Sequence, residues 1–328
     1  MPFEFNINKV IIKRDNNNIQ RKIMGLKLKI IANPTSGREM AKINIEDMLS
    51  YLVSQGSITR ADIYYTAGPD DARKFAMDTD PSEYDYVIAV GGDGTVNEVI
   101  TGLCTAGIDI PLAIYTSGTV NDFATAVGMP TSPSDFARML INPTFQKVDV
   151  GRVNDRYFLN VLAAGILSEI SYQVPSELKT NFGPVAYWLA AIKDIPAFGS
   201  TIPLRITAND QVIDTDAMMI FISNTTSVGG FRKLMSLADI EDGVLDVLVL
   251  KKVEPADVVP LMAKLMMGDH LDSEKVIYFQ SDKIYLETRG DHPEVVLDLD
   301  GERGPTLPVK IECIADSINL IVPKEEGN

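Results

Sequence analysis

The residues best suited to chemistry form a glycine-rich segment from Val90 to Glu98, with the sequence Val-Gly-Gly-Asp-Gly-Thr-Val-Asn-Glu. It separates an apolar run typical of a buried strand from a pattern typical of a helix. Glycines there let main-chain N–H groups approach a phosphate closely, and a helix N-terminus adds partial positive charge. Asp93 would repel a polyphosphate unless a divalent cation lay between them, so its carboxylate implies Mg²⁺. The alternative is a tight structural turn with Asp93 as the helix N-cap.

Two further polar loops follow neighbouring strand patterns. Asn33 to Gly37 reads Asn-Pro-Thr-Ser-Gly, and its hydroxyls, amides and small residues suit a nucleotide phosphate near a helix start. Ser117 to Asp122 reads Ser-Gly-Thr-Val-Asn-Asp and brings a second acid, Asp122, to the same sheet edge. Each loop taken singly is more often an ordinary turn or cap. Three such loops around one sheet edge favour a shared nucleotide cleft.

Alternating strand and helix patterns surround these loops from Lys27 to about Val150. Such alternation predicts a mostly parallel sheet with helices on both faces, and ligands of such sheets bind beyond the carboxyl ends of the strands. The expected strands are Leu28–Ala32, Ile63–Tyr65, Tyr86–Val90 and Pro111–Tyr115, and the expected helices are Arg38–Leu52, Asp70–Met77, Val96–Leu103 and Val120–Val127.

The pattern changes near residue 150. Short strand-like runs separated by Gly, Asn, Asp and Pro then predominate, which predicts a mainly antiparallel second domain. Two helical patterns interrupt them, at Gly183–Asp194 and Glu254–Met267. A chain of 328 residues has the length of about two domains, which agrees with this division.

Composition excludes several classes of protein. The longest wholly apolar run, Val185–Ile192, is far shorter than the ~20 residues of a transmembrane helix. The two cysteines, Cys104 and Cys313, lie far apart in the sequence, so neither a disulfide framework nor a zinc site is expected. This cysteine usage predicts a cytoplasmic setting. A net charge of −15 disfavours nucleic acid as a partner. The first 30 residues differ from the rest, because they carry a local charge of +5.

The combined motifs resemble the bacterial diacylglycerol kinase and lipid kinase family, whose catalytic domain is shared with sphingosine and ceramide kinases. The resemblance runs from about Leu26 to the C-terminus and is carried by Asn33–Gly37, Gly91–Glu98, Gly118–Asp122, Asp242–Gly243 and Asp300–Glu302. The glycine-rich turn alone also occurs in NAD kinases and phosphofructokinases.

The resemblance implies a two-domain architecture. An N-terminal α/β nucleotide-binding domain with a NAD-kinase-like, mostly parallel sheet covers residues 26–150, and a C-terminal β-sandwich domain covers residues 151–305. The last segment, from about 306 to 328, returns to the first domain, and the cleft between the domains holds the reaction. Residues 1–25 are a basic N-terminal extension, and the sequence leaves open whether it is ordered or disordered.

The family's binding pattern also assigns site residues. ATP would be contacted by Asn33, Pro34, Thr35, Ser36, Gly37, Thr66, Gly92, Asp93, Gly94, Thr95, Val96, Asn97, Glu98 and Thr119. Glu302 matches the proton acceptor that deprotonates the lipid hydroxyl, and Asp93 and Asp122 would hold a Mg²⁺ and water network. Asp300 would support the loop. Without the resemblance, Asp300–Glu302 reads as a hairpin turn with solvated carboxylates.

A second acidic loop runs from Asp239 to Val244. In the family the corresponding loop binds a structural Mg²⁺, which implies Asp239, Asp242 and the main-chain carbonyl of Val244 as ligands. Hard oxygen donors from one short loop suit such an ion. An acidic surface turn is an equally good interpretation.

The expected function is an ATP-dependent lipid kinase that transfers the γ-phosphate to a lipid hydroxyl, with diacylglycerol converted to phosphatidic acid as the first choice. The alternatives are another acceptor, such as phosphatidylglycerol, a monoacylglycerol or a sphingoid base, and a catalytically silent nucleotide or lipid sensor. The expected partners are ATP and a lipid at the membrane surface, contacted peripherally and transiently, and a homodimer is compatible with the chain. His270 and His292 are expected to be solvated surface residues, and Met262, Met266 and Met267 core residues.

Overall fold

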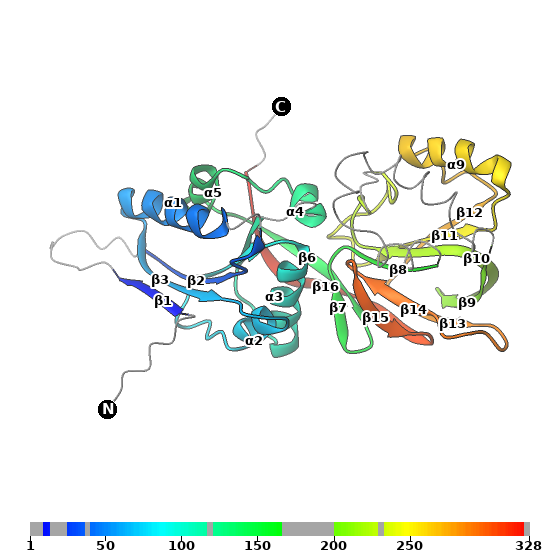
Figure 1. Ribbon diagram of the computed structural model, residues 1–328, viewed down its shortest axis with the longest axis horizontal. Helices are drawn as coiled ribbons and strands as arrows, with labels where there is room; N and C mark the ends of the chain where they lie inside the picture. Colours follow the sequence, from blue (N-terminus) through cyan, green and yellow to red (C-terminus); the bar gives the residue numbers. More distant parts are fainter. Residues whose placement is uncertain are drawn as a thin grey trace. The chain divides into compact units, whose positions relative to one another are not determined.

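The computed structural model describes residues 9–13, 25–36, 40–116, 121–165, 200–228 and 233–324, and the structural findings concern these ranges. The chain divides into two compact units (Figure 1). Unit 1 comprises Met1–Val148 and Asp316–Asn328, and unit 2 comprises Asp149–Ala315. The helix expected at Gly183–Asp194 lies outside the described residues.

Unit 1 is built on a mostly parallel sheet, which confirms the predicted fold class. The order of its strands is β1-β3-β2-β4-β5-β16. Strands β2 to β5 are mutually parallel, β1 pairs antiparallel with β3, and the end of β16 pairs parallel with β5. The strand bounds are β1 Lys9–Lys13, β2 Leu26–Ala32, β3 Ile58–Tyr65, β4 Tyr86–Gly91, β5 Leu112–Thr116 and β16 Val309–Val322.

Helices cover both faces of this sheet, with α1 and α5 on one side and α2 and α3 on the other (Figure 1). The helix α1 is amphipathic: Ala41, Ile45 and Leu52, at helical spacing, are buried. The helix α5 was not among the helices expected from the sequence, although Ser132 caps it by accepting a hydrogen bond from the Asp135 N–H. The bounds are α1 Met40–Ser54, α2 Asp71–Met77, α3 Asp93–Ala106, α4 Asp122–Ala126 and α5 Pro133–Ile141.

Unit 2 is an antiparallel β-structure, as expected, and all its described strand pairings are antiparallel. Strands β6 and β16 each continue from one unit into the other. The helix α9, Pro255–Met267, closely matches the expected helix at Glu254–Met267. The remaining strands are β6 Thr144–Val153, β7 Arg156–Phe158, β8 Val161–Gly165, β9 Ile202–Ala208, β10 Gln211–Ser223, β11 Leu245–Lys251, β12 Val276–Ser281, β13 Lys283–Thr288, β14 Val296–Leu299 and β15 Glu302–Thr306.

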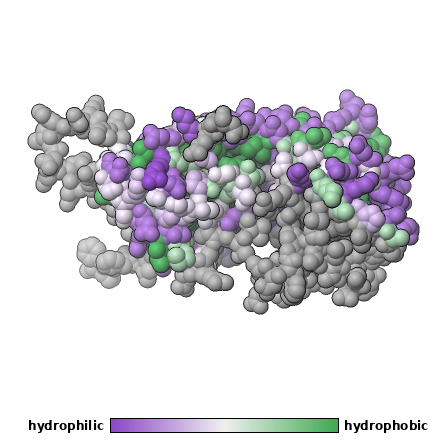
Figure 2. Space-filling model, turned by 90° about the horizontal axis from the view of Figure 1, so that it is seen from above, coloured by the Kyte–Doolittle hydropathy of each residue, from purple (hydrophilic) through white to green (hydrophobic). Residues whose placement is uncertain are grey.

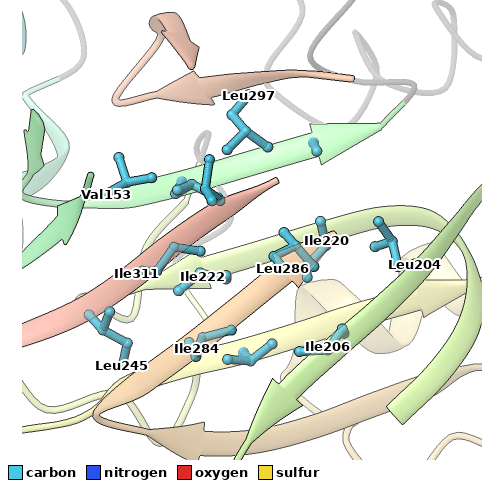
Figure 3. Packing of buried hydrophobic residues seen from close by; sticks show 14 of the residues in the cluster. Val153, Leu204, Ile206, Ile220, Ile222, Leu245, Ile284, Leu286, Leu297 and Ile311 are labelled. Carbon is cyan, nitrogen blue, oxygen red and sulfur yellow. The ribbon is translucent and has the colours of Figure 1, made fainter. Parts of the chain in front are cut away.

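Strand alternation divides the interior of unit 2 into two apolar clusters. On β10, Ile220 and Ile222 join the main cluster, whose aliphatic side chains interdigitate in Figure 3, while Met219 joins a second cluster. On β11, Val247 joins the main cluster and Leu248 the second one. Successive side chains of a strand point to opposite faces, so these strands are buried on both sides. The second half of β10 and most of β11 therefore lie in the interior of unit 2.

Two sequence expectations about unit 2 are wrong. His270 is fully buried, and its Nε2 atom lies 2.8 Å from the carbonyl oxygen of Leu234. Burial lowers the pKa of His270. Met267, expected in the core, is 67% exposed. It is the last residue of α9, where the chain leaves the buried face of the helix.

On the face drawn in Figure 2, the residues that the structure describes are mostly hydrophilic, and the hydrophobic ones lie in separate small patches. Among the described residues, no helix combines the length and apolarity that crossing a lipid bilayer requires.

Candidate active site

The carboxyl ends of four parallel strands of unit 1 lie in register at one edge of the sheet. Ala32 of β2 is opposite Tyr65 of β3 and Val90 of β4, and Gly91 is opposite Thr116 of β5. The next residues continue this alignment. The N–H of Asn33 donates to the carbonyl of Val90 at 2.9 Å, and the N–H of Thr66 donates to the carbonyl of Ala32 at 2.9 Å. The structure therefore brings the Asn33 loop, Thr66 and the glycine-rich turn together.

The loop after β2 is a compact polar turn. The Oδ1 atom of Asn33 accepts hydrogen bonds from the N–H of Thr35 at 3.0 Å and from its hydroxyl at 2.8 Å. The Ser36 hydroxyl donates to the Asn33 carbonyl at 2.9 Å. Pro34 lies inside this turn. Gly37, the last predicted ligand of the loop, lies outside the described residues.

The glycine-rich turn is constrained by close packing. A Cβ atom added to Gly91 would lie 2.5 Å from Thr95, which excludes every other residue type without a shift. Gly92 is the N-cap of α3, and its carbonyl accepts the N–H of Val96 at 3.1 Å. The first N–H groups of a helix have no partner within it, so this turn presents donors suited to a phosphate. Asp93 and Gly94 lie in that first turn.

The predicted ligand Glu98 has an observed structural role. Its two carboxylate oxygens accept the N–H groups of Asp70 and Ala72, each at 3.0 Å, at the start of α2. Asp71 accepts two main-chain N–H groups of the loop that follows Thr66, and these bonds hold its pKa below the ordinary range. The two carboxylates therefore fix the loop between β3 and α2. Asn97 accepts a hydrogen bond from the Thr101 hydroxyl at 3.3 Å, within α3.

The third predicted loop is described in part, since residues 117–120, including Thr119, lie outside the described residues. Asn121 has a left-handed conformation, with φ of 52°, and precedes α4. Asp122 is the first residue of α4, as Asp93 is the first residue of α3. These helices follow β5 and β4, which are neighbours in the sheet. The two acids therefore hold equivalent positions after adjacent strands.

In unit 2, Asp300 anchors the turn between β14 and β15. Its carboxylate accepts the N–H groups of Leu159 at 2.7 Å, Asn160 at 3.0 Å and Val161 at 2.8 Å. Asp300 and Gly301 both have positive φ, at 51° and 88°. Positive φ is unusual for a residue other than glycine, but aspartate tolerates it better than most. The three hydrogen bonds hold this conformation in place.

Glu302 follows this anchored turn as the first residue of β15. Its side chain is 55% exposed, and its Oε2 atom lies 3.9 Å from the Nη2 atom of Arg156. The Nη1 atom of Arg156 donates to the carbonyl of Arg303 at 2.6 Å. The motifs gave no signal for Arg156, because it lies on β7, far from Glu302 in the sequence.

The second acidic loop of unit 2 is organised by its own carboxylates and by Asp149. Asp239 accepts the N–H of Glu241 at 3.0 Å, and Asp242 accepts the N–H of Val244 at 3.1 Å. Asp149 of β6 accepts the N–H of Gly243 at 2.7 Å. Val244 thus lies in the same turn as the two predicted acidic ligands.

Carboxyl groups crowd together in this loop. Burial raises the pKa of Asp242, and the neighbouring charges of Asp239 and Asp149 raise it further. Burial likewise raises the pKa of Asp246 to about 7, with Asp242 and Asp239 adding to the effect. Within the described part of the chain, no group of three or more His, Cys, Asp or Glu side chains has the arrangement of a metal site. A cation bound here would therefore need main-chain oxygen, which is the set that the resemblance implies.

Comparisons with known proteins cover nearly the whole chain. Residues 27–153 match the diacylglycerol kinase catalytic domain, and residues 160–322 match the YegS C-terminal NAD kinase beta sandwich-like domain. The diacylglycerol kinase of Bacillus subtilis is 34% identical over 300 residues, which are 91% of this chain and 97% of that protein. That of Staphylococcus haemolyticus is 35% identical over 300 residues, 92% of this chain and 89% of the relative.

Solved structures show the same relation. A crystal structure of a diacylglycerol kinase from Bacillus anthracis has 26% identity and a TM-score of 0.74, and the match covers 92% of this chain and 99% of that one. Yeast NADH kinase, with 13% identity and a TM-score of 0.50 over 92% of this chain and 85% of its own, is similar in fold alone. The two domain matches and the identity shared along nearly the full chain place this protein in the diacylglycerol kinase family, and it is a lipid kinase.

Proposed function

We propose that the protein transfers the γ-phosphoryl group of ATP to the hydroxyl of diacylglycerol, forming phosphatidic acid. The observation that carries the proposal is the alignment of the Asn33 loop, Thr66 and the glycine-rich turn at one sheet edge. This edge is where ligands of parallel sheets bind. The close relatives named diacylglycerol kinase support the choice of lipid.

The first turn of α3 is the part of the site best suited to hold the phosphates. It combines N–H donors that lack helical partners with the positive end of the helix dipole. Gly91 and Gly92 keep side chains away from that end, since Thr95 fills the space beside Gly91. The fixed loop between β3 and α2, held by Glu98 and Asp71, would border the nucleotide.

Asp93 and Asp122 are the residues that would hold the Mg²⁺ of the nucleotide. They are carboxylates at the starts of helices that follow adjacent strands, and hard oxygen donors suit this ion. Bound there, the ion would offset the negative charge of the phosphates. The helix dipole at each position favours the ionised form of a carboxylate.

Glu302 would accept the proton of the lipid hydroxyl as its oxygen attacks the γ-phosphorus. An exposed carboxylate meets this requirement, and the Asp300 clamp holds the turn that carries it. The leaving group is ADP. This assignment gives the nucleotide to unit 1 and proton acceptance to unit 2.

The loop from Asp239 to Val244 is proposed to bind a structural divalent cation. The pKa of Asp242 is raised by burial and by the neighbouring charges of Asp239 and Asp149, and a cation bound here would offset these charges. Asp239, Asp242 and the main-chain oxygen of Val244 would be its ligands. This site would stabilise the fold of unit 2 and take no part in the transfer.

The test is a kinase assay with purified protein, labelled ATP, Mg²⁺ and mixed micelles. The micelles offer diacylglycerol, phosphatidylglycerol, a monoacylglycerol or a sphingoid base in separate reactions, and labelled phosphatidic acid is the expected main product. Labelling of another lipid instead would reassign the acceptor. ATP binding without any labelled lipid would favour the silent sensor.

The substitution Glu302→Gln removes the proposed general base. Loss of a general base reduces turnover by roughly 10²- to 10⁴-fold, so this variant should lose activity to that extent while it folds and binds ATP normally. Glu294→Gln is the matched control, because Glu294 is an exposed glutamate of the same unit. Turnover of Glu302→Gln close to that of the control would remove Glu302 from the mechanism.

A further inference from the structure

We propose that Arg156 is a positioning residue for Glu302: it fixes the carboxylate and keeps it ionised. The inference rests on the proposed role of Glu302 as proton acceptor. Arg156 contacts the catalytic hairpin through both ends of its guanidinium group, one near the Glu302 carboxylate and one on the main chain of the next residue.

The contact to the main chain is the stronger of the two. The Nη1 atom of Arg156 lies 2.6 Å from the Arg303 carbonyl oxygen, within hydrogen-bond distance. Its Nη2 atom, 3.9 Å from the Glu302 Oε2 atom, is too far for a hydrogen bond but close enough for an ion pair. A guanidinium is planar, so a hydrogen bond from one nitrogen also orients the other. The main-chain contact therefore aims a positive charge at the carboxylate.

Arg156 places a positive charge within ion-pair distance of the Glu302 carboxylate. Opposite Glu302 on β14 is Leu299, which has no charge, while Arg303 is opposite Asp298. The carboxylate of Asp298 accepts the N–H of Gly301 at 2.8 Å, and that of Asp300 accepts three main-chain N–H groups. The two neighbouring carboxylates thus accept main-chain N–H groups of the hairpin and its surroundings, while the guanidinium of Arg156 lies beside Glu302.

The distance of the ion pair suits a base that must also react. A carboxylate held by short bidentate hydrogen bonds would lose much of its proton affinity and its freedom to reach a substrate. At 3.9 Å, and with about half of each side chain exposed, the pair favours ionisation without covering the oxygen. Together with the Asp300 clamp, Arg156 holds the residues on both sides of Glu302 and leaves the carboxylate accessible.

The experiment compares Arg156→Gln and Arg156→Lys in the full chain. Glutamine keeps an N–H donor for the Arg303 carbonyl but removes the charge, while lysine keeps the charge. For Arg156→Gln we expect kcat to fall roughly tenfold to a hundredfold, with KM for ATP within about twofold. Loss of a nearby cation raises the pKa of a carboxylate, so the acidic limb of the kcat profile should move to higher pH. Arg156→Lys should keep that limb near its original position.

Two further variants separate positioning from structure. Arg152→Met is the matched control, since Arg152 forms an ion pair with Glu312 on another part of unit 2, and it should leave kcat and the pH profile unchanged. The double variant Glu302→Gln with Arg156→Gln should be no slower than Glu302→Gln alone, because Arg156 acts through Glu302.

Normal turnover of Arg156→Gln beside an inactive Glu302→Gln would overturn the inference and leave the proposed function intact. A full additional loss in the double variant, or a lower kcat with an unmoved acidic limb, would also overturn it. Normal turnover of Glu302→Gln would instead refute the base assignment, and this inference with it.

Discussion

Unit 2 contains two acidic turns that differ in how their charge is compensated. In the turn that carries Asp300, the carboxylates of Asp298 and Asp300 accept main-chain N–H groups, and Arg156 lies beside Glu302. In the turn from Asp239 to Val244, the carboxyl groups of Asp239 and Asp242 are exposed and lie near the buried carboxyl group of Asp246 on β11, and the pKa values of Asp242 and Asp246 are raised. The carboxylates of the first turn are stabilised by main-chain N–H groups, whereas in the second turn the raised pKa values favour a proton on the carboxyl groups.

The contrast shows that acidic residues alone do not define a site. Hydrogen bonds from main-chain N–H groups stabilise an ionised carboxylate, and such a carboxylate becomes part of the scaffold. Asp300 is such a case, and it leaves the neighbouring Glu302 exposed for chemistry. Asp242 represents the other case, in which desolvation and the neighbouring charges of Asp239 and Asp149 raise the pKa of the carboxyl group. Substitutions in the two turns should therefore differ in their effects on stability.

Asp300→Ala should strongly destabilise unit 2. The substitution leaves three main-chain N–H groups without their acceptor, and each buried unsatisfied donor costs about 1 to 3 kcal/mol. Since the groups are only partly buried, we expect a loss of about 3 kcal/mol, measured by urea unfolding. Asp291→Ala, at an exposed aspartate of the same unit, should be neutral. A loss below about 1 kcal/mol would show that the clamp is dispensable.

Mg²⁺ should stabilise the protein through the other turn. A ligand at 100 times its Kd stabilises the folded state by about 2.7 kcal/mol. We therefore expect Tm at pH 8 to rise on titration with Mg²⁺ in the absence of nucleotide, and Asp242→Asn to abolish most of the increase. Asp93→Asn is the control, because Asp93 is a proposed ligand of the Mg²⁺ that accompanies the nucleotide and not of the structural cation. This variant should keep the increase in Tm. An equal response of Asp242→Asn and the unchanged protein would refute the structural cation site.

Asp246 should make stability depend on pH. Its carboxyl pKa is about 7 in the folded protein against 3.8 ordinarily, so the folded state binds the proton more tightly. The contribution of Asp246 to the free energy of unfolding should then be highest below pH 4 and should fall between about pH 4 and 7. Without divalent cations, Asp246→Asn should flatten this decline and be about 1 to 2 kcal/mol more stable at pH 8. Identical pH profiles of the two proteins, measured by thermal unfolding in EDTA, would contradict the assignment.

Much of the architecture was accessible from sequence because its signals are local. Strand and helix alternation gave the parallel sheet of unit 1, and the Val90 to Glu98 segment marked the turn between β4 and α3. The start of α3 was placed at Val96, whereas the helix begins at Asp93. The reason is that the glycines hide the helical pattern of the first turn. The helix α5 was missed because it is short, although Ser132 and Pro133 carry a readable start signal.

The residues that complete the site depend on contacts between distant segments. Glu98 belongs to the glycine-rich motif, but its bonds to the start of α2 follow only from the packing of α2 on α3. Arg156 meets Glu302 through the arrangement of β7 and β15, which no spacing rule gives. The burial of His270 is similar, since a polar local sequence concealed a fully enclosed ring. Local pattern therefore located the loops, while tertiary packing determined what each side chain does.

The pairing of β1 with β3 has a consequence for handling the protein. From Lys9 opposite Tyr64 to Lys13 opposite Arg60, β1 covers the edge of the unit 1 sheet. An uncovered edge strand offers its N–H and carbonyl groups to any other extended chain. Removing the N-terminal residues up to Lys13 would expose β3 in this way. Such a truncated preparation would present the eight residues of β3 as its edge on concentration and storage, in place of the five residues of β1.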